Sequence, residues 1–490
     1  MPLSNLRILF FGVLICLFCA SRATYRDWVL LDAMHRIEKE ALYKPQDAHG
    51  FDELLFESAI NGMISLLYSE GDQYSQYVPE NEMKDFQKEV SARYEGIGVS
   101  FRHDTVEKKF IVFFTFVDSP AWRAGLRHGD TLLAVDGEEV AGLEFSEVAS
   151  RIRGEPNTEV TLTVLQRSRT EPVNIPVKRA SLQPQSILGD TLREDGSSRF
   201  TLETEPDIAY LNLTSSFIET TADEMKKIIR SLPSDVRGMI LDLRDNPGGF
   251  LDISVNVADM FVKATEQHRD IVTTQRRDHS TKSRYPASSQ TLFDLPMVVL
   301  IDKGSASASE ILAACLQDFG RAKIVGTRSY GKGTVQEMFF LPRGYGILKL
   351  TDASYWRPSG KNIQRIGDAP ESEEWGVTPD EGCVVPISKK QRMATQYIRR
   401  FRSYIPNADA GEAVREARRE LEILTAEQNT TRQPAGDTLS PEEPDDDVAE
   451  DDQAVAEEPS PEPFEIQGTA PYYDPQLDRA IEELRRMIHP

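Results

Sequence analysis

The chain has 490 residues, of which 40% are hydrophobic and 28% charged, so it is long enough for two or three domains with sizeable cores. The formal net charge of −23 argues against nucleic acid as a partner. Twelve Asp or Glu and no Lys or Arg lie between Pro441 and Glu465, so about half of the net charge belongs to one short segment.

Residues 1–23 have the pattern of an export signal. Arg7 precedes an apolar run over 8–20, and Ser21-Arg22-Ala23 then offers small residues for cleavage. The run is short for a transmembrane helix. We therefore expect an exported protein of the periplasm or cell envelope, and the alternative is that the segment stays uncleaved as an inner-membrane anchor.

Residues 24–90 are expected to be a helical region. Apolar residues such as Leu30, Leu31, Met34 and Ile37 recur at helical spacing, and residues 54–68 repeat this character. The pattern alone indicates only that these helices are amphipathic, and it assigns them no function.

Residues 91–180 carry strand and turn signals. Gly96-Ile97-Gly98-Val99 could form a loop whose amides receive a peptide's terminal carboxylate, beside a strand edge to which the peptide adds. The glycines allow the close backbone approach that this requires. Such a loop is more often a simple turn, but this one precedes Ser119-Pro120-Ala121 and a long run that together resemble a PDZ domain.

Residues 181–205 are polar and turn-rich, and they are interpreted as a linker. From about residue 206 the pattern alternates between strands at 238–243 and 297–301 and helices at 225–232 and 251–262. The strands are continuously apolar, which favours a sheet covered on both faces.

Gly248 and Gly249 follow the first of these strands and open the next helix. Their amides could stabilise an oxyanion, although a plain strand-to-helix turn would use the same residues. The pattern does not decide which glycine would donate.

Ser307 is the candidate nucleophile. Small residues over 304–309 lead into an apolar helix face that begins with Ile311 and Leu312, which places Ser307 at a helix N-terminus. The amide of Ala308 could there hold an oxyanion, because the first amides of a helix have no internal partner. A helix cap is the simpler interpretation of the same residues.

A serine nucleophile needs a base, and Lys332 is the candidate. It lies between Gly331 and Gly333, where the backbone can turn sharply, and a buried lysine loses its proton readily. Gln336 could orient the amine only if the backbone bends near Gly333, since four residues of straight strand span about 13 Å. A solvated glycine turn is the competing interpretation.

Taken together, residues 241–249, 304–311 and 330–336 closely resemble the carboxyl-terminal processing peptidases, the PDZ-containing Ser-Lys proteases of peptidase family S41A. The resemblance implies Ser307 as nucleophile, Lys332 as general base, Gln336 as its orienting partner, and Ala308 with Gly248 as oxyanion donors. We expect no cofactor and no metal, since the sequence contains no zinc-type ligand spacing.

The fold implied is an α/β (α+β) protease core of the ClpP/crotonase-like type over 206–385, with an inserted, β-sandwich-like PDZ domain and helical N- and C-terminal extensions. The implied substrates are polypeptides bound by their C-termini through Gly96, Ile97, Gly98 and Val99. The resemblance also implies a homodimer formed through the terminal helices and makes the PDZ domain a candidate gate for the site.

The C-terminal part contains three different segments. Residues 386–427 are expected to be helical and basic, with a solvated face, whereas the Pro- and acid-rich residues 428–469 are expected to be disordered. Residues 470–490 return to an amphipathic helix, which by resemblance packs against the N-terminal region. The basic residues are Lys389, Lys390, Arg392, Arg399, Arg400 and Arg402.

Other chemistries fit the sequence less well. Cys315 falls on the apolar helix face, which favours a buried thiol over a disulfide with Cys383. The seven histidines lie outside the two motifs, which disfavours a histidine triad. The prediction is thus an exported serine endopeptidase, and the alternative is a non-catalytic PDZ scaffold on an inactive protease fold.

Overall fold

The computed structural model describes residues 24–41, 50–91, 93–104, 108–213, 216–367, 369–370, 372–407, 415–417 and 474–489. The chain divides into two units: Met1–Gln87 with Val335–Asp352, and Lys88–Thr334 with Ala353–Pro490. The predicted export signal and acidic segment lie outside the described residues. Within the described ranges, no helix is long and apolar enough to cross a membrane.

The first unit combines N-terminal helices with a β-hairpin. Its helices are α2 (Thr24–Glu40), α3 (Phe51–Ser69), the short η1 (Glu80–Glu82) and the beginning of α4 (Met83–Val90). Strand β1 (Gln76–Val78) pairs antiparallel with the first residues of β20 (Ile347–Trp356). The hairpin joins β19 (Thr334–Phe340) to β20 through η2 (Pro342–Gly344).

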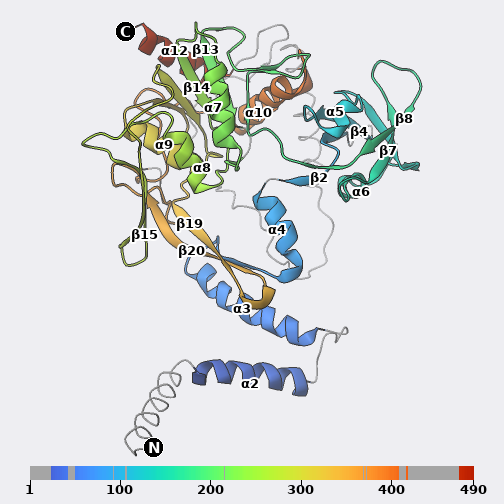
Figure 1. Ribbon diagram of the computed structural model, residues 1–490, viewed down its shortest axis with the longest axis vertical. Coiled ribbons are helices and arrows are strands. Elements are labelled where there is room, and N and C mark those ends of the chain that lie inside the picture. The colour runs from blue at the N-terminus through green and yellow to red at the C-terminus, as the bar shows by residue number, and fades with distance from the viewer. Residues whose placement is uncertain are drawn as a thin grey trace, which may run out of the picture. The chain divides into compact units, whose positions relative to one another are not determined.

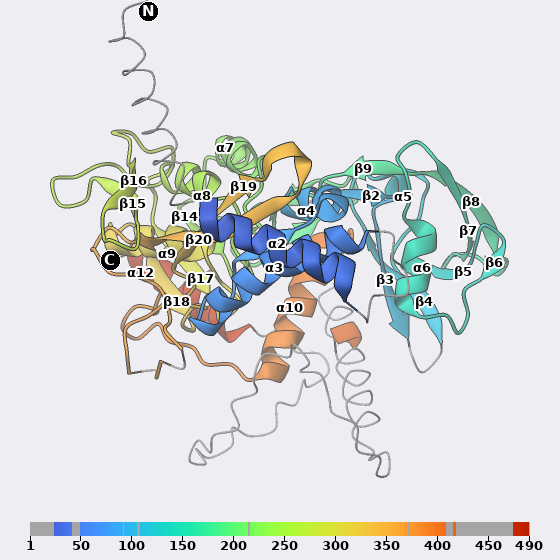
Figure 2. The ribbon, with the colours of Figure 1, turned by 90° about the horizontal axis from the view of Figure 1, so that it is seen from below.

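In the second unit, one module is a six-stranded antiparallel sheet with two short helices (Figures 1 and 2). Helices α5 (Pro120–Arg123) and α6 (Phe145–Ile152) contribute Ala121, Val148 and Ile152 to its core. A separate antiparallel pair joins β2 (Tyr94–Gly96) to β9 (Ala180–Leu182). In spatial order the sheet strands are β3 (Val99–Asp104), β4 (Lys109–Thr115), β5 (Thr131–Val135), β7 (Glu159–Leu165) and β8 (Val173–Lys178), with β6 (Glu138–Glu139) on β5.

The other module is built on a five-stranded sheet with a parallel centre. Every residue of its three central strands is buried, which confirms the prediction of a sheet covered on both faces. In spatial order the strands are β10 (Ile187–Leu188), β13 (Ile208–Leu213), β14 (Gly238–Asp242), β17 (Met297–Ile301) and β18 (Lys323–Gly326), and all except β10 are parallel.

Helices cover this sheet. Helix α12 (Pro475–Ile488) packs Ala480 and Leu484 against Ile240 and Leu300 on one face. Side chains alternate across a strand, so Leu241 and Val299 point to the opposite face. Helices α8 (Leu251–Ala258) and α9 (Ala308–Asp318) pack on each other, and α7 (Thr221–Ser231) packs on α8 (Figure 1).

The remaining elements complete this unit. Strand β15 (Asp270–Gln275) pairs with β16 (Thr281–Pro286) and with the end of β20, and β11 (Thr191–Leu192) pairs with β12 (Ser198–Arg199). Helix α10 (Lys389–Tyr404) begins with a capping box formed by Ser388 and Gln391.

Several expectations about these elements need correction. The helix expected over 251–262 ends at Ala258. Residues 181–205 are more than a linker, because Ile187 and Leu188 are buried and form an edge strand of the core sheet. The C-terminal helix was expected against the N-terminal region, whereas the apolar face of α12 covers the core sheet.

Candidate active site

Three loops meet at one edge of the parallel sheet. They follow β14, β17 and β18, which are neighbours, and the carboxyl ends of parallel strands lie on the same side. The first loop carries Gly248, the second Ser307 and the third Lys332. A Cβ built on Gly304 would lie 2.9 Å from the Cα of Asp245, so the first two loops are in direct contact.

Ser307 is the N-cap of α9, and its backbone has φ 55° and ψ −115°. Such dihedral angles are unfavourable for a residue with a side chain and persist only where the surroundings enforce them. Ser307 is half-buried, while Ala308 and Ser309 after it are buried. The amide of Ala308 therefore opens the helix beside the Ser307 side chain, as the sequence predicts.

Glu310 joins the serine loop to the lysine loop. Its side chain is fully buried, and Oε2 accepts hydrogen bonds from the N–H of Ser307 at 2.8 Å and of Lys332 at 2.9 Å. Oε1 accepts from the N–H of Gly331 at 2.6 Å and pairs with the hydroxyl of Ser329. Two nitrogens bonded to one oxygen lie within roughly 6 Å of each other, so this carboxylate sets the two backbones side by side.

Burial raises the pKa of Glu310 to about 7, although its four hydrogen bonds act in the opposite direction. Sequence reasoning assigned Glu310 no role. The available signal was its position three residues after the helix N-cap, where an acidic side chain reaches back to the N-cap amide.

The Lys332 loop depends on its two glycines. Gly331 has φ 90°, and a Cβ there would lie 2.9 Å from the Cβ of Arg365. A Cβ on Gly333 would lie 2.4 Å from the N of Gln364. The carbonyl of Gly333 accepts from the N–H of Tyr355 in β20 at 3.0 Å, so contact with β20 begins at the residue before β19. Lys332 itself is half-buried.

The two candidate oxyanion glycines have different surroundings. A Cβ on Gly248 would lie 2.8 Å from the Cβ of Ser307 and 2.9 Å from the N of Ala308, whereas on Gly249 it would meet the backbone of Phe217 at 2.4 Å. Gly248 is thus the glycine in contact with the serine loop. Its N–H donates to Oδ1 of Asn246 at 2.9 Å, so donation to an oxyanion by Gly248 stays a prediction.

Asn246 is a second residue that sequence reasoning left without a role. It is fully buried, and its side-chain amide donates to the carbonyl of Leu213 at 3.0 Å. The Ser309 hydroxyl reaches Oδ1 of Asn246 at 2.9 Å, and the N–H of Ala306 donates to the Asn246 carbonyl at 3.0 Å. Asn246 therefore fastens the glycine turn to the serine loop.

Gln336 belongs to the first unit, whereas Ser307 and Lys332 belong to the second. Its Nε2 donates to the hydroxyl of Thr351 at 3.2 Å, and that hydroxyl donates to Oδ1 of Asp72 at 2.9 Å. Its role as partner of Lys332 stays a prediction.

The predicted carboxylate-binding loop lies where β2 leads into β3. Gly98 has φ 78°, Ile97 is buried, and the Gly98 carbonyl accepts from the N–H of Phe116 at 3.0 Å and from the hydroxyl of Ser119 at 3.1 Å. In the part of the sheet that the structure describes, Val99 begins an edge strand paired with β4 alone. An edge strand can accept a further strand from a peptide.

The remaining observations concern the two described cysteines and the arrangement of metal-ligand side chains. Cys315 and Cys383 are both buried free thiols, which agrees with the buried position expected for Cys315. No group of three or more His, Cys, Asp or Glu among the residues with described positions is arranged to hold a metal ion.

The basic residues of α10 were predicted to form a solvated face, and this prediction is wrong for two of them. Lys389, Lys390 and Arg400 are exposed, but Arg399 and Arg402 are buried. The buried arginines pair with carboxylates of the core, among them Asp242 and Asp190, so their positive charge serves internal ion pairs.

Comparison with known proteins identifies two matching families. The model for peptidase family S41 matches residues 207–381, and a PDZ domain model matches residues 117–166. The carboxy-terminal-processing protease of Bartonella bacilliformis is 34% identical over 348 residues, which cover 70% of this chain and 72% of that protein.

The carboxy-terminal processing protease CtpB of Bacillus subtilis is 32% identical over 342 residues, covering 69% of this chain and 67% of that protein. A solved structure of a photosystem II D1 C-terminal processing protease matches 74% of this chain and 93% of its own chain, at 23% identity and a TM-score of 0.41.

Proposed function

Because this chain belongs to peptidase family S41 and is a serine-type peptidase with a PDZ domain, we propose that it is an exported endopeptidase that uses a Ser-Lys mechanism. Ser307 is the nucleophile, Lys332 the general base, and Gln336 the residue that orients the lysine amine. The contacts of Glu310 support this assignment most directly, since one carboxylate oxygen binds the backbone N–H of both Ser307 and Lys332.

The reaction proceeds in two stages. The neutral amine of Lys332 takes the proton of the Ser307 hydroxyl as its oxygen attacks the peptide carbonyl. The N–H of Ala308, together with the Gly248 turn, stabilises the oxyanion, and the Lys332 ammonium then protonates the leaving amine. A water molecule gives a proton to Lys332 and attacks the acyl-enzyme, which releases the new carboxyl terminus and restores Ser307.

Cleavage of a denatured protein tests the mechanism. Wild type should cut casein, whereas Ser307→Ala and Lys332→Ala should lose activity by a factor of about 10⁴ or more. Lys226→Ala, on the exposed face of α7, is the matched control and should retain full activity. If either site variant cuts as fast as wild type, the assignment is wrong.

The PDZ domain is proposed to bind substrate C-termini through Gly96, Ile97, Gly98 and Val99. The support is the glycine loop ahead of an edge strand, which can offer amides to a carboxylate and a backbone edge to a peptide. Fluorescence polarisation should show binding of a peptide with a free C-terminus and at least about tenfold weaker binding of its amidated form. Equal binding of both forms would contradict C-terminal recognition.

Assembly and fold type complete the proposal. We propose a homodimer formed through the N-terminal helices, because Trp28 and Leu31 on α2 and Met63 and Leu66 on α3 are more than half exposed. Sedimentation equilibrium should give a dimer that the double variant Leu31→Glu, Leu66→Glu converts to a monomer.

The fold type and membrane association are also part of the proposal. The alternation of parallel strands and helices supports a ClpP/crotonase-like core. If the N-terminal segment stays uncleaved, it would attach the protein to the membrane.

A further inference from the structure

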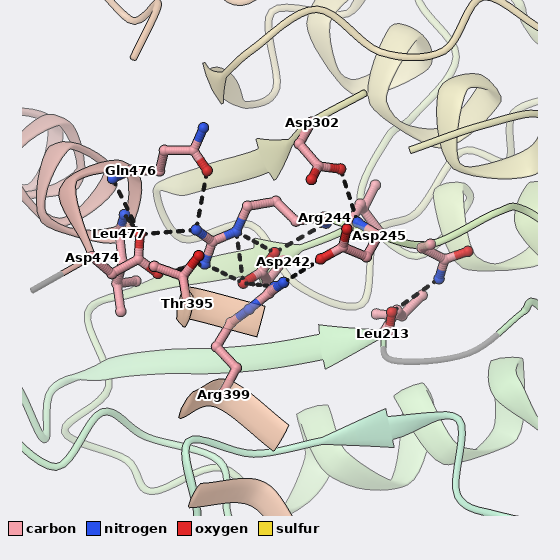
Figure 3. Close-up of polar contacts among 12 residues, drawn as sticks. Leu213, Asp242, Arg244, Asp245, Asp302, Thr395, Arg399, Asp474, Gln476 and Leu477 are labelled. Atoms are coloured by element: carbon pink, nitrogen blue, oxygen red, sulfur yellow. Dashed lines mark hydrogen bonds and ion pairs between the residues drawn. The ribbon is translucent and has the colours of Figure 1, made fainter. Parts of the chain in front are cut away.

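A buried cluster of charged side chains lies at the end of β14 (Figure 3). Asp242 and Arg244 come from the end of β14 and the residues after it, Arg399 from α10, and Asp474 from the start of α12. The side chains of Asp242, Arg244 and Asp474 are 0 to 2% exposed, and that of Arg399 is 9% exposed. Three regions far apart in the sequence therefore share one cluster.

Asp474 has two functions in this cluster. Its carboxylate accepts from Nη1 and Nη2 of Arg244, each at 2.9 Å, and it caps α12 by accepting from the N–H of Gln476 at 3.2 Å and of Leu477 at 3.1 Å. Oε1 of Gln476 adds a neutral contact to Nη1 of Arg244 at 3.2 Å. Burial alone would raise the pKa of Asp474. The charge of Arg244, its hydrogen bond to Asp474 and the charge of Arg399 together outweigh burial and lower this pKa, so the carboxylate is ionised.

A continuous series of ion pairs and hydrogen bonds leads from Asp474 to Asp245, at the start of the glycine turn. Arg244 contacts Asp242 through Nε at 2.9 Å and Nη2 at 2.7 Å, and Oδ2 of Asp242 accepts from Nη1 of Arg399 at 2.9 Å. Nη2 of Arg399 then bonds Oδ2 of Asp245 at 2.7 Å.

This series of contacts ends at Asp245 and constrains its backbone conformation. It has φ 60°, a conformation that a residue with a side chain holds only under constraint. The next residue, Asn246, binds the N–H of Gly248 and the hydroxyl of Ser309. The conformation of Asp245 therefore sets the start of the turn that faces Ser307.

We propose that Asp474 is a positioning residue for peptide hydrolysis, so that the C-terminal segment is a working part of the active site. This inference rests on the function proposed above. Asp474 lies beyond residue 381, where the match to the family model ends. When Asp474 loses its carboxylate, the buried guanidinium of Arg244 has one ionic partner fewer. The side chains of Asp242, Arg399 and Asp245 then shift to compensate for the lost ion pair.

The expected kinetic signature follows from what the turn does. A displaced turn weakens stabilisation of the oxyanion, which exists only in the transition state, so kcat should fall while KM changes little. A role limited to docking α12 would instead lower thermal stability and leave kcat unchanged in the folded enzyme.

The test compares variants of the full chain in kcat, KM and Tm, with an internally quenched peptide as substrate. Asp474→Asn removes the charge but retains a residue suited to the N-cap. We expect its kcat to fall by about ten- to a hundredfold, with KM within about twofold of wild type. Asp478→Asn, the same change at an exposed site on the same helix, should match wild type.

Two further variants separate positioning from stability. Leu484→Ala removes a buried apolar contact of α12 outside the cluster, so it should lower Tm and leave kcat unchanged well below that Tm. If Asp474→Asn does not fold, Gln476→Met serves as the second variant. It removes the neutral contact to Arg244 and the hydrogen bond from Nε2 to the Val385 carbonyl, and it should lower kcat less, in the same direction.

The inference is overturned if Asp474→Asn has the kcat of Asp478→Asn, or if kcat falls equally in Leu484→Ala at the same loss of Tm. It is also overturned if Asp474→Asn is unfolded and Gln476→Met has wild-type kcat. Ser307→Ala in the same assay tests the proposed function separately. Retained activity in this variant would refute the proposed function, whereas it would not bear on the role of Asp474.

Discussion

At the scale of single residues, the candidate site depends on the buried carboxylate of Glu310 and on the absence of a side chain at Gly248. Ser307 has an unfavourable backbone conformation, and Glu310 holds it by accepting the Ser307 N–H while binding the Lys332 loop through the same oxygen. Gly248 leaves room beside Ser307 that any side chain would fill. The geometry of the candidate site thus depends on Glu310 and Gly248, to which the proposed mechanism gives no bond-making step.

The glycines give the first prediction. Gly248→Ala should lower kcat by about a hundredfold or more, because the new methyl group would lie 2.8 Å from the Cβ of Ser307. Gly249→Ala should lower Tm instead, since its methyl group meets the Phe217 backbone. Gly320→Ala is the control for positive φ, because φ is 61° there and no atom lies within 4 Å of the new Cβ. Equal kcat in the Gly248 and Gly320 variants would contradict the prediction.

Glu310 gives a pH-dependent prediction. Its pKa in the folded protein is about 7, above the ordinary value of 4.5, so the folded state binds the proton more tightly than the unfolded state. The contribution of this group to stability is therefore complete below pH 4.5 and is lost as the pH rises to about 7. Catalysis should respond in the opposite sense, because the ionised carboxylate is the form that accepts the N–H of Ser307 and of Lys332.

We expect kcat/KM to rise with pH up to about 7, because the Glu310 carboxyl loses its proton over this range. Glu310→Gln should lower the rate by about a hundredfold and reduce the slope of log kcat/KM against pH below 7 by about one. Glu381→Gln, at an exposed position, should keep the wild-type profile. A wild-type slope in the Glu310 variant would show that this carboxylate does not titrate with activity.

At the scale of secondary structure, α10 has two interacting faces. One carries Arg392 and Arg399, which pair with Asp245 and Asp302 of the core loops. The other packs aromatic rings on β4 of the PDZ module: Tyr397 on Phe113 at 5.0 Å between ring centroids, and Tyr404 on Phe114 at 4.1 Å. The helix thereby connects the PDZ module to the loops of the candidate site.

Phe401 tests this connection, because it is fully buried in the cluster that also contains Ile398 and Ile405. Phe401→Ala should destabilise the protein by about 3–5 kcal/mol, and hydrogen exchange should increase in β4 and α10 more than in the core sheet. Phe145→Ala, at an exposed position of the PDZ module, should change the unfolding free energy by less than about 0.5 kcal/mol. Unchanged exchange in β4 would mean that the PDZ module does not depend on α10.

At the scale of the whole molecule, about half of the net negative charge lies in a segment outside the part of the chain that carries the candidate site. The acidic residues between Pro441 and Glu465 supply about half of the net charge, yet they precede a helix that belongs to the central core. The loops of the candidate site follow three adjacent parallel strands, and the family match covers 207–381. The segments outside that match add α10 and α12, both in contact with the core.

Export gives the prediction that belongs to this scale. When the full chain is expressed in a bacterium, the mature protein should begin near residue 24, and its peptidase activity should appear in the envelope fraction. Intact mass spectrometry and fractionation measure both outcomes. An N-terminus at residue 1 with activity in the membrane pellet would support the anchor alternative, and activity only in the cytoplasm would contradict export.

The sequence by itself determined the local chemistry of this protein. Small residues before an apolar helix face placed Ser307 at a helix N-terminus, and paired glycines marked the turns at Lys332 and Gly248. The apolar run at Met297–Ile301 became a buried strand as expected. These features depend on backbone sterics and on hydrophobic periodicity, both of which act over a few residues.

Only the tertiary structure decided which charges meet. Arg399 belongs to a stretch with the composition of a solvated face, yet packing buries it on Asp242, 157 positions earlier. Asp474 meets Arg244 across 230 positions. A sequence gives the sign of each charge, but burying a charge is favourable only beside its partner, and the folded chain alone determines which partner lies within reach.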